Sequence, residues 1–254
     1  MGKSDLKKEK KLQTDSEVRI NRYLADCGFG SRRKTEELIL SGFVTVNGET
    51  VRELSRKIQV GSDEVKVRGK VAIPEQEIYV IALNKPKGYL CSHSDRFHEE
   101  TVFSLLPEKF ARLAIAGRLD LESRGLLLLS NDGKIVQRLS HPTMASEKEY
   151  LVRIDRKISF SKIKQEFLQG IQEGEETLRA EKVFLDLEGR ENSESDRFRV
   201  ILQQGRKRQI RRMFSALGAR VVDLQRVRIG NILLIDLGIK EGEYVSLNPN
   251  RWRS

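Results

Sequence analysis

The chain has 254 residues, and its 47 lysines and arginines outnumber its 37 aspartates and glutamates, giving a formal net charge of +10. This excess favours a polyanionic partner, with nucleic acid the first expectation and an anionic membrane surface the second. A membrane anchor is disfavoured, because no apolar run approaches the roughly 20 residues of a span and no signal-peptide pattern follows the start. We therefore expect a cytoplasmic protein that folds as one large domain or two smaller ones.

Cysteine and histidine spacing argues against two further classes. Cys27 and Cys91 are far apart, and His93, His98 and His141 complete no metal-ligand pattern. Disulfide frameworks and zinc sites both need such residues at characteristic spacings. We expect neither, and interpret the histidines as solvated or core residues.

The first 70 residues predict a tail and a small helical unit. Residues 1–16 are lysine-rich with little to bury, which predicts a disordered basic tail. Apolar residues then recur at helical spacing until Gly28-Phe29-Gly30 ends the helix, and Ser31 is expected to cap a second helix. Cations in a first helical turn oppose the helix dipole, so we predict that those of the second helix contact phosphate groups. They are Arg32, Arg33 and Lys34.

A hairpin completes this unit. Residues 44–46 and 65–67 predict strands, and Asn47-Gly48 is a hairpin-turn signal. The stretch INRYLADCGFGSRRKTEELILSGFVTVNG resembles the S-four (αL) RNA-binding module in its basic turn and its ending. The resemblance implies an S-four-like RNA-binding domain over residues 17–70, and the alternative is an unrelated small α+β lobe. Residues 71–77 lack hydrophobic periodicity and predict a linker, which leaves residues 78–254 as a second domain.

The second domain begins with a buried strand over residues 78–83 that enters the basic loop Asn84-Lys85-Pro86-Lys87-Gly88. We predict that Lys85 and Lys87 contact RNA phosphate, with a solvated turn as the alternative. Further on, four leucines bracketed by turn formers predict a short buried strand, and Gly117-Arg118-Leu119-Asp120 stands at its mouth. Ionised Asp120 needs a compensating cation there, for which Arg118 is one candidate; the alternative is a turn with an exposed Arg/Asp pair.

The next strand, over residues 145–152, places Lys148 and Tyr150 on one face, where a cation and a ring can meet a planar, negatively charged ligand. The alternative is a core tyrosine. Ser159 is expected to cap a helix ending at Gly170. After a strand over residues 198–202, five cations can track a phosphate backbone at the start of a helix, with one of them turned inward. They are Arg206, Lys207, Arg208, Arg211 and Arg212.

Taken together, the motifs NKPKG, AGRLDLESRGLLLLSNDG, EKEYLV, LQQGRKRQIRRMFSALG and LQRVRIGNILL resemble the successive motifs of RsuA/RluB/RluF-type pseudouridine synthases. That family commonly carries the S-four module in front, so the resemblance spans nearly all of residues 17–247. It implies that Asp120 is the catalytic carboxylate, that Arg211 pairs with it, and that Arg118 displaces the base. The remaining site residues that it implies are Tyr150 stacking on the uracil, Lys148 beside it, Leu224 on the pocket floor, and Arg208 and Gln209 contacting substrate.

These assignments suit the chemistry. Isomerising uridine breaks the bond from ribose to a ring nitrogen and joins the ribose to a ring carbon, so we expect no cofactor and no metal. An arginine in contact keeps the carboxylate of Asp120 ionised. Unstacking the base costs a few kcal/mol, offset by Arg118 and by stacking on Tyr150, worth about 1 to 3 kcal/mol. Attack on the ring, attack on the sugar and abstraction of a sugar proton all stay open.

The sequence thus predicts an α+β protein, with a mixed, mainly antiparallel pseudouridine-synthase sheet flanked by helices behind a small α/β RNA-binding domain. We expect a monomer that isomerises a specific uridine of ribosomal RNA, more specifically 23S rRNA of the large subunit, as free RNA or in a pre-ribosomal particle. The alternatives are a catalytically silent RNA-binding or ribosome-assembly factor, and a synthase acting on small-subunit rRNA or tRNA.

Overall fold

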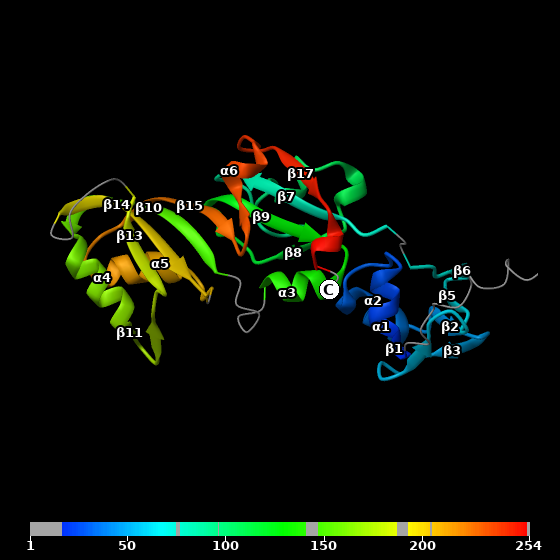
Figure 1. Ribbon diagram of the computed structural model, residues 1–254. Coiled ribbons are helices and arrows are strands. Elements are labelled where there is room, and N and C mark those ends of the chain that lie inside the picture. Colours follow the sequence, from blue (N-terminus) through cyan, green and yellow to red (C-terminus); the bar gives the residue numbers. More distant parts are fainter. Residues whose placement is uncertain are drawn as a thin grey trace, which may run out of the picture. The chain divides into compact units, whose positions relative to one another are not determined.

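A computed structural model describes residues 17–74, 77–95, 97–140, 147–186, 193–203 and 205–252. The chain divides into two compact units between Glu77 and Ile78 (Figure 1). The predicted basic tail, residues 1–16, lies outside the described residues. Within the described ranges, no helix is both long and apolar enough to cross a bilayer.

The first unit is a small sheet with two helices packed on it. Its elements are β1 (Glu17–Arg19), α1 (Ile20–Asp26), α2 (Arg32–Leu40), β2 (Val44–Val46), β3 (Glu49–Val51), β4 (Lys57–Gln59), β5 (Val65–Val67) and β6 (Lys70–Val71). Strands β3-β2-β5-β6 pair in that order, all antiparallel, while β1 pairs with β4. Leu24 and Ile39 bury the apolar sides of the two helices against Val44 and Val65.

Two local signals of the first unit are confirmed, and one boundary is wrong. The Ser31 hydroxyl accepts a hydrogen bond from the Lys34 amide at 3.3 Å, so it caps α2 as predicted. Asn47 and Gly48 have φ angles of 52° and 86°, the left-handed pair that a two-residue type I′ hairpin requires. The linker was predicted to begin at residue 71, but β6 pairs with β5, and buried Ala72 accepts a hydrogen bond from Tyr23.

The second unit is built on one large sheet. Its strands are β7 (Val80–Lys85), β8 (Ala114–Ala116), β9 (Arg124–Ser130), β10 (Lys148–Ser159), β11 (Ile171–Glu173), β12 (Glu176–Leu178), β13 (Lys182–Leu185), β14 (Glu194–Leu202), β15 (Val221–Ile229), β16 (Ile232–Leu233) and β17 (Tyr244–Leu247). Its helices are α3 (Gly133–Ser140), α4 (Phe160–Gln169), α5 (Gln209–Ala216) and α6 (Leu234–Leu237), with 3-10 turns η2 (Val102–Leu105), η3 (Glu108–Phe110) and η5 (Pro249–Trp252).

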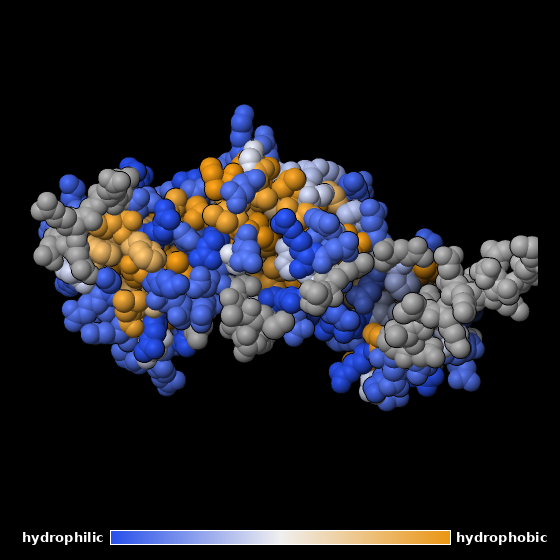
Figure 2. Space-filling model, in the orientation of Figure 1, coloured by the Kyte–Doolittle hydropathy of each residue, from blue (hydrophilic) through white to orange (hydrophobic). Residues whose placement is uncertain are grey.

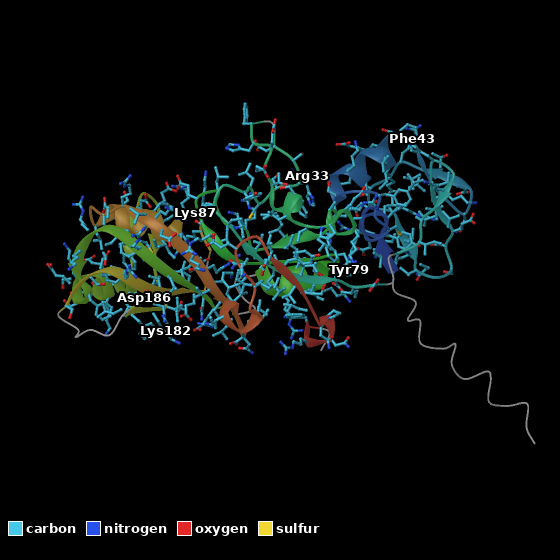
Figure 3. The ribbon with its side chains drawn as sticks, turned by 90° about the horizontal axis from the view of Figure 1, so that it is seen from above. Arg33, Phe43, Tyr79, Lys87, Lys182 and Asp186 are labelled. Atoms are coloured by element: carbon cyan, nitrogen blue, oxygen red, sulfur yellow. The ribbon has the colours of Figure 1, made fainter. Side chains whose placement is uncertain are left out.

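The sheet runs in the order β13-β14-β10-β15-β9-β7-β17, with β8 added on β9 and β16 on β15, while β11 and β12 form a separate hairpin. Figure 3 labels Lys182, the first residue of the edge strand β13, and Asp186, which directly follows that strand. Every pairing in the large sheet is antiparallel except the short parallel contact between β15 and β9. The predicted mixed, mainly antiparallel α+β fold is therefore confirmed.

The two halves of the sheet are covered differently. Helices α4 and α5 pack on one face of β13, β14, β10 and β15 around Phe167, Phe198 and Phe214. In the other half, β9 is buried on both faces, because Leu126 and Leu128 pack toward α3 whereas Leu127 and Leu129 pack toward η2 and η3. A continuous apolar run is typical of a strand covered on both faces, so the leucine strand forms as predicted.

Two predictions for the second unit were wrong. Residues 84 and 85 belong to strand β7 and are buried, so the basic loop begins at Pro86. Ser159 ends strand β10 and gives α4 no side-chain cap; its hydroxyl instead shares a hydrogen bond of 2.8 Å with Ser161. A strand that extends to the first residue of a helix leaves no turn in which a capping hydroxyl can face the helix amides.

Candidate active site

The loop of residues 117–123 carries Asp120, and a different buried cation holds each of its two ends. Arg226, on β15, donates from Nη2 to the carbonyl of Gly117 at 2.8 Å and from Nε to that of Leu126 at 2.7 Å. At the other end, Lys85 donates from Nζ to the carbonyls of Ser123 at 2.7 Å and Asp120 at 3.3 Å. The backbone around the carboxylate is therefore fixed relative to β7, β9 and β15.

The role predicted for Lys85 was wrong. Its side chain is 0% exposed, and the carbonyls of Pro86 and Leu121 complete a cage of four oxygens around Nζ. Burial lowers the pKa of this ammonium to about 8. A lysine buried in this way cannot contact RNA phosphate. The NKPKG motif suggested two surface cations because proline and glycine follow, but the first lysine still belongs to the strand.

A cavity of about 630 Å³ lies beside this loop. Asp120 lines it from the loop, Lys148 and Tyr150 from β10, and Leu224 and Arg226 from β15. Further predicted residues around it are Arg118, Arg206, Lys207, Arg208 and Gln209. The structure thus gathers nine of the sequence-predicted site residues around one cavity, although they come from four separate motifs.

The cavity wall combines an aromatic ring with buried positive charge. Tyr150 and Arg226 are direct cross-strand partners, and Lys148 lies two residues before Tyr150 on the same face of β10. Burial lowers the pKa of Lys148, and the neighbouring charge of Arg226 lowers it further. The predicted pairing of a cation with a ring on one strand face is therefore present in the structure. Arg226 was missed, although its position two residues after Leu224 places it on the same strand face.

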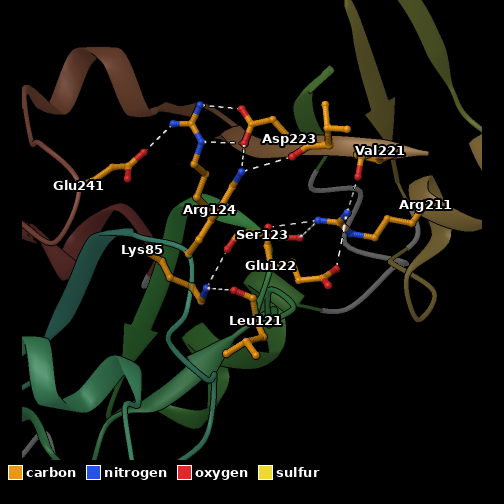
Figure 4. A network of polar contacts seen from close by, with 11 residues as sticks. Lys85, Leu121, Glu122, Ser123, Arg124, Arg211, Val221, Asp223 and Glu241 are labelled. Atoms are coloured by element: carbon orange, nitrogen blue, oxygen red, sulfur yellow. Dashed lines mark hydrogen bonds and ion pairs between the residues drawn. The ribbon is translucent and has the colours of Figure 1, made fainter. Parts of the chain in front are cut away.

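Arg211 is turned inward from α5, as one arginine of this helix was expected to be, with a side chain 12% exposed. It donates to the carbonyl of Val221 at 3.0 Å, to that of Glu122 at 3.2 Å and to the hydroxyl of Ser123 at 3.3 Å (Figure 4). Burial lowers the pKa of its guanidinium, and the charges of Glu122 and Asp120 oppose that shift. It therefore braces the loop of residues 117–123, the proposed catalytic loop, through backbone and hydroxyl oxygens.

The predicted direct pair between Arg211 and Asp120 is not formed. Among the described residues, no ion pair of 4.0 Å or less joins these two side chains, and the carboxylate nearest Arg211 is that of Glu122, at 3.7 Å. Glu122 was missed by sequence reasoning. Its place two residues after Asp120 was a signal, because residues of one tight loop share the same neighbours.

The remaining basic residues around α5 are mostly paired with carboxylates. Arg212 contacts Glu173 at 2.5 Å and Glu176 at 2.7 Å, and Arg206 contacts Glu176 at 3.1 Å. Gln209 uses its amide within the chain, donating to the carbonyl of Arg179 at 2.8 Å and accepting from the amide of Arg206 at 3.2 Å. Its predicted contact with substrate and the RNA contacts of Arg206, Arg212 and the exposed Lys207 stay predictions.

The other predicted RNA-contact residues are not among those that line the 630 Å³ cavity. Arg32, Arg33 and Lys34 are exposed on the first turn of α2 in the first unit, where Lys34 also pairs with Glu37 at 2.9 Å. Lys87 is exposed after β7 and pairs with Asp223 at 2.6 Å. Whether these side chains contact RNA stays a prediction.

A carboxylate beside an aromatic ring and buried cations, in a cavity large enough for a nucleotide, suits an enzyme that acts on a nucleobase. Residues 79–216 match the family model described as RNA pseudouridylate synthase, and residues 18–65 match that of the S4 domain. The chain therefore belongs to the RNA pseudouridine synthase family, and the family, fold and enzyme class predicted from the sequence are confirmed.

Individual relatives agree with this assignment. The chain is 35% identical over 239 residues to an uncharacterized RNA pseudouridine synthase of Aquifex aeolicus (strain VF5), which covers 93% of this chain and 92% of the relative. It is 33% identical over 233 residues to the ribosomal large subunit pseudouridine synthase B of Bacillus subtilis (strain 168), covering 91% and 93%. A crystal structure of a pseudouridylate synthase superposes with a TM-score of 0.64 at 30% identity and covers 92% of this chain and 97% of that one.

Proposed function

We propose that this chain converts a specific uridine of large-subunit ribosomal RNA into pseudouridine, with Asp120 as its catalytic carboxylate. The observation that carries the proposal is the convergence of Asp120, Tyr150, Lys148 and Leu224 on one cavity beside a rigidly held loop. The relatives named as ribosomal large subunit pseudouridine synthase B support the choice of RNA.

The reaction breaks the bond from ribose C1′ to uracil N1 and joins C1′ to C5; C5 loses its proton, and N1 ends protonated. Asp120 supplies the anionic oxygen at the mouth of the cavity. The ring of Tyr150 is placed to stack on a base that has left its helix, which contributes about 1 to 3 kcal/mol. Arg118 is exposed on the same loop, where it can fill the space left by the base.

Arg211 acts on Asp120 at short range but without direct contact. Its three hydrogen bonds hold the loop, and the charge of Asp120 in turn opposes the lowering of the Arg211 pKa by burial. We propose that it remains a positioning residue until RNA binding excludes water from the cavity, which strengthens the interaction between the two charges.

Substitution of the carboxylate tests the assignment. Asp120→Asn should abolish pseudouridine formation in rRNA from cells that lack the gene, while the Kd for that RNA stays within about twofold, because the basic side chains around the cavity are kept. Asp236→Asn, on α6 and outside the cavity, is the matched control and should keep full activity. Pseudouridine formed by the Asp120→Asn variant would refute the assignment.

The choice of RNA needs a separate experiment. Chemical mapping of pseudouridines in cells with and without the gene should show one or a few large-subunit positions that depend on it. A missing position in small-subunit rRNA or tRNA would replace the proposed substrate. No lost position, together with continued binding to ribosomal particles, would instead favour a silent assembly factor.

We also propose that the enzyme works as a cytoplasmic monomer. Light scattering of the purified chain should then give a mass close to 29.2 kDa, and fractionated cells should hold the protein with the ribosomal pool. A mass near twice that value would contradict the monomer.

A further inference from the structure

A second cavity, of about 820 Å³, lies on the other side of the catalytic loop. It shares Leu121 and Arg208 with the first cavity, so the two adjoin. Four cationic side chains line it, with Glu122 as a carboxylate among them. The four are Lys87, Arg208, Arg211 and Arg220. A surplus of positive charge in a concave site of this kind focuses the field and attracts anions.

Two of these cations can turn to a new anion without leaving a carboxylate unpaired. Lys87 contacts Asp223, which Arg124 already holds through two hydrogen bonds of 3.1 and 2.8 Å (Figure 4). Arg220 is 81% exposed and lies 3.8 Å from Asp155, which also pairs with Arg156 at 3.5 Å. Lys87 and Arg220 can therefore each leave the present carboxylate partner and bind another anion.

Glu122 occupies the position between the other two cations. Its carboxylate lies 3.2 Å from Arg208 and 3.7 Å from Arg211, while Arg211 holds its backbone carbonyl at 3.2 Å. The side chain is 60% exposed, so the carboxylate can swing outward although the backbone is fixed. A carboxylate between two guanidinium groups uses the same donors that a phosphate would use.

Arg208, the residue before α5, has an unusual backbone conformation at the border of the two cavities. Its φ of 52° is left-handed, which is uncommon for a residue other than glycine and costs free energy. The conformation places the side chain between the two cavities, where it lines both. An arginine that borders both cavities can contact the RNA backbone next to a nucleotide that is bound in the 630 Å³ cavity.

We propose that the second cavity binds the RNA phosphodiester next to the nucleotide in the catalytic cavity, and that Glu122 occupies the phosphate position until RNA displaces it. This inference rests on the proposed function, because it takes the catalytic cavity to hold a nucleotide. It assigns to Glu122 the role of a displaceable internal anion that lowers affinity for RNA, and to Arg220 the role of a phosphate contact.

Removing the charge of Glu122 tests the first part. The substrate is large-subunit rRNA from cells that lack the gene, with Kd measured by filter binding. Glu122→Gln should lower the Kd about two- to fivefold, because the charge that competes with the RNA phosphate is lost. Glu241→Gln removes an exposed carboxylate that pairs with Arg124 outside the cavity, and should leave the Kd unchanged.

A Glu122→Gln variant with an unchanged or higher Kd would overturn the proposal. A higher Kd would mean that the carboxylate holds Arg208 and Arg211 in place for RNA and is not displaced by a phosphate.

Substitution of Arg220 gives a second, independent test of the proposed phosphate site. Arg220→Gln should raise the Kd about two- to fivefold and reduce the slope of log Kd against log salt concentration by about 0.7 to 0.9, the value for one phosphate contact. Arg156→Gln is the matched control, since Arg156 pairs with the same Asp155, is 60% exposed and does not line the cavity. Equal effects of the two substitutions would overturn the phosphate contact.

The two proposals fail in different ways. If the wild-type chain makes no pseudouridine, the proposed function fails, and the Kd values still report on the cavity. If the wild-type chain is active and both variants behave like their controls, the proposal for the second cavity fails alone.

Discussion

Lys85 shows what a buried charge contributes to the catalytic loop. Its ammonium gives hydrogen bonds to the carbonyls of Asp120 and Ser123, and no other side chain of this length has as many donors at one point. Burying an ammonium is costly, and the carbonyl cage offsets that cost only while the loop keeps its shape. Lys85 therefore couples the ionisation of its own side chain to the position of the Asp120 carboxylate.

Replacing Lys85 by methionine keeps the length of the side chain and removes the ammonium. We expect the single-turnover rate to fall about tenfold, equivalent to about 1.4 kcal/mol, because the loop carbonyls lose their donors. Lys182→Met, on the exposed edge strand β13, should keep wild-type activity. Single-turnover kinetics on rRNA from cells that lack the gene measure the rates of both variants. An unchanged rate for Lys85→Met would show that the loop keeps its position without the ammonium.

The lowered pKa of Lys85 gives a second test. As pH rises through about 8, the ammonium loses its proton and one donor, so activity should decline above that pH in the wild type but not in Lys85→Met. Stability should change in the opposite direction. The unfolded chain keeps the proton to about 10.5 and the folded chain only to about 8, so unfolding free energy rises with pH between these values. Urea denaturation at pH 7.5 and pH 10 measures the change in unfolding free energy. If activity and stability depended on pH in the same way in Lys85→Met, Lys85 would not be the titrating group.

Asp223 has the opposite shift. Burial alone would raise its pKa, but hydrogen bonds from Arg124 and Lys87 outweigh burial and lower it to about 2. Its contribution to stability is present above the unfolded pKa near 3.8 and is lost as pH falls through about 2. Asp223→Asn should cost about 1 to 2 kcal/mol at pH 7, a value reduced by partial exposure. Denaturation curves of the two proteins should converge between pH 4 and pH 2; a constant difference would show that the carboxylate charge is not the cause.

At the scale of elements, the active site depends on one junction between strands. β15 and β9 pair in parallel only through Gln225 with Arg124 and Arg226 with Gly125. This contact joins the half of the sheet that carries Tyr150 to the half that holds the catalytic loop. Gly125 allows the close approach, because its φ is 103° and an added Cβ would lie 2.2 Å from the carbonyl oxygen of Arg226.

Gly125→Ala should therefore separate β15 from β9. We expect a loss of about 3 kcal/mol or more in unfolding free energy, because neither backbone can move without breaking the hydrogen bonds of Arg226. Gly174→Ala, at a φ of 60° with open space around it, carries the conformational strain alone and should cost about 1 kcal/mol. Chemical denaturation compares the two. Equal losses would mean that strain, and not the close approach, determines the effect.

Elements with a strong local signal could be predicted from the sequence, and those formed by long-range pairing could not. The leucine strand, the Asn47-Gly48 turn and the Ser31 cap follow from patterns a few residues long. Strands such as β11 and β17 are three or four residues long and form because a partner strand is present. The predicted cap at Ser159 was wrong for a related reason, since pairing with β14 extends β10 to that residue.

The candidate site shows the same limit. The sequence identified Asp120, Lys148, Tyr150 and Leu224 through motifs, and the structure places all four around one cavity. It did not identify Arg226 or Glu122, whose importance comes from contacts with residues about 90 to 110 positions away. Charge alone could not separate a buried lysine from an exposed one, which is why Lys85 and Lys87 received the same role.

Some of the exposed apolar side chains of the second unit lie close to one another. Figure 2 shows apolar side chains gathered around α6, where Leu233 and Ile235 are exposed. Basic side chains instead line both cavities beside the catalytic loop and the first turn of α2. Part of the positive charge of the chain, which has a net charge of +10, is therefore concentrated at the two cavities and at the first turn of α2. Each of these three sites should contribute separately to RNA binding.

This distribution predicts that the first unit adds affinity without affecting chemistry. Arg33, exposed on α2, should contact one phosphate, so Arg33→Gln should raise the Kd for rRNA about two- to fivefold and lower the salt slope by about 0.7 to 0.9. The rate at saturating RNA should not change, because Asp120 and its loop lie in the other unit. Lys66→Gln, on β5 of the same unit and paired with Glu64, is the control and should change neither quantity. A lower rate at saturating RNA for Arg33→Gln would instead mean that the first unit helps to position the uridine.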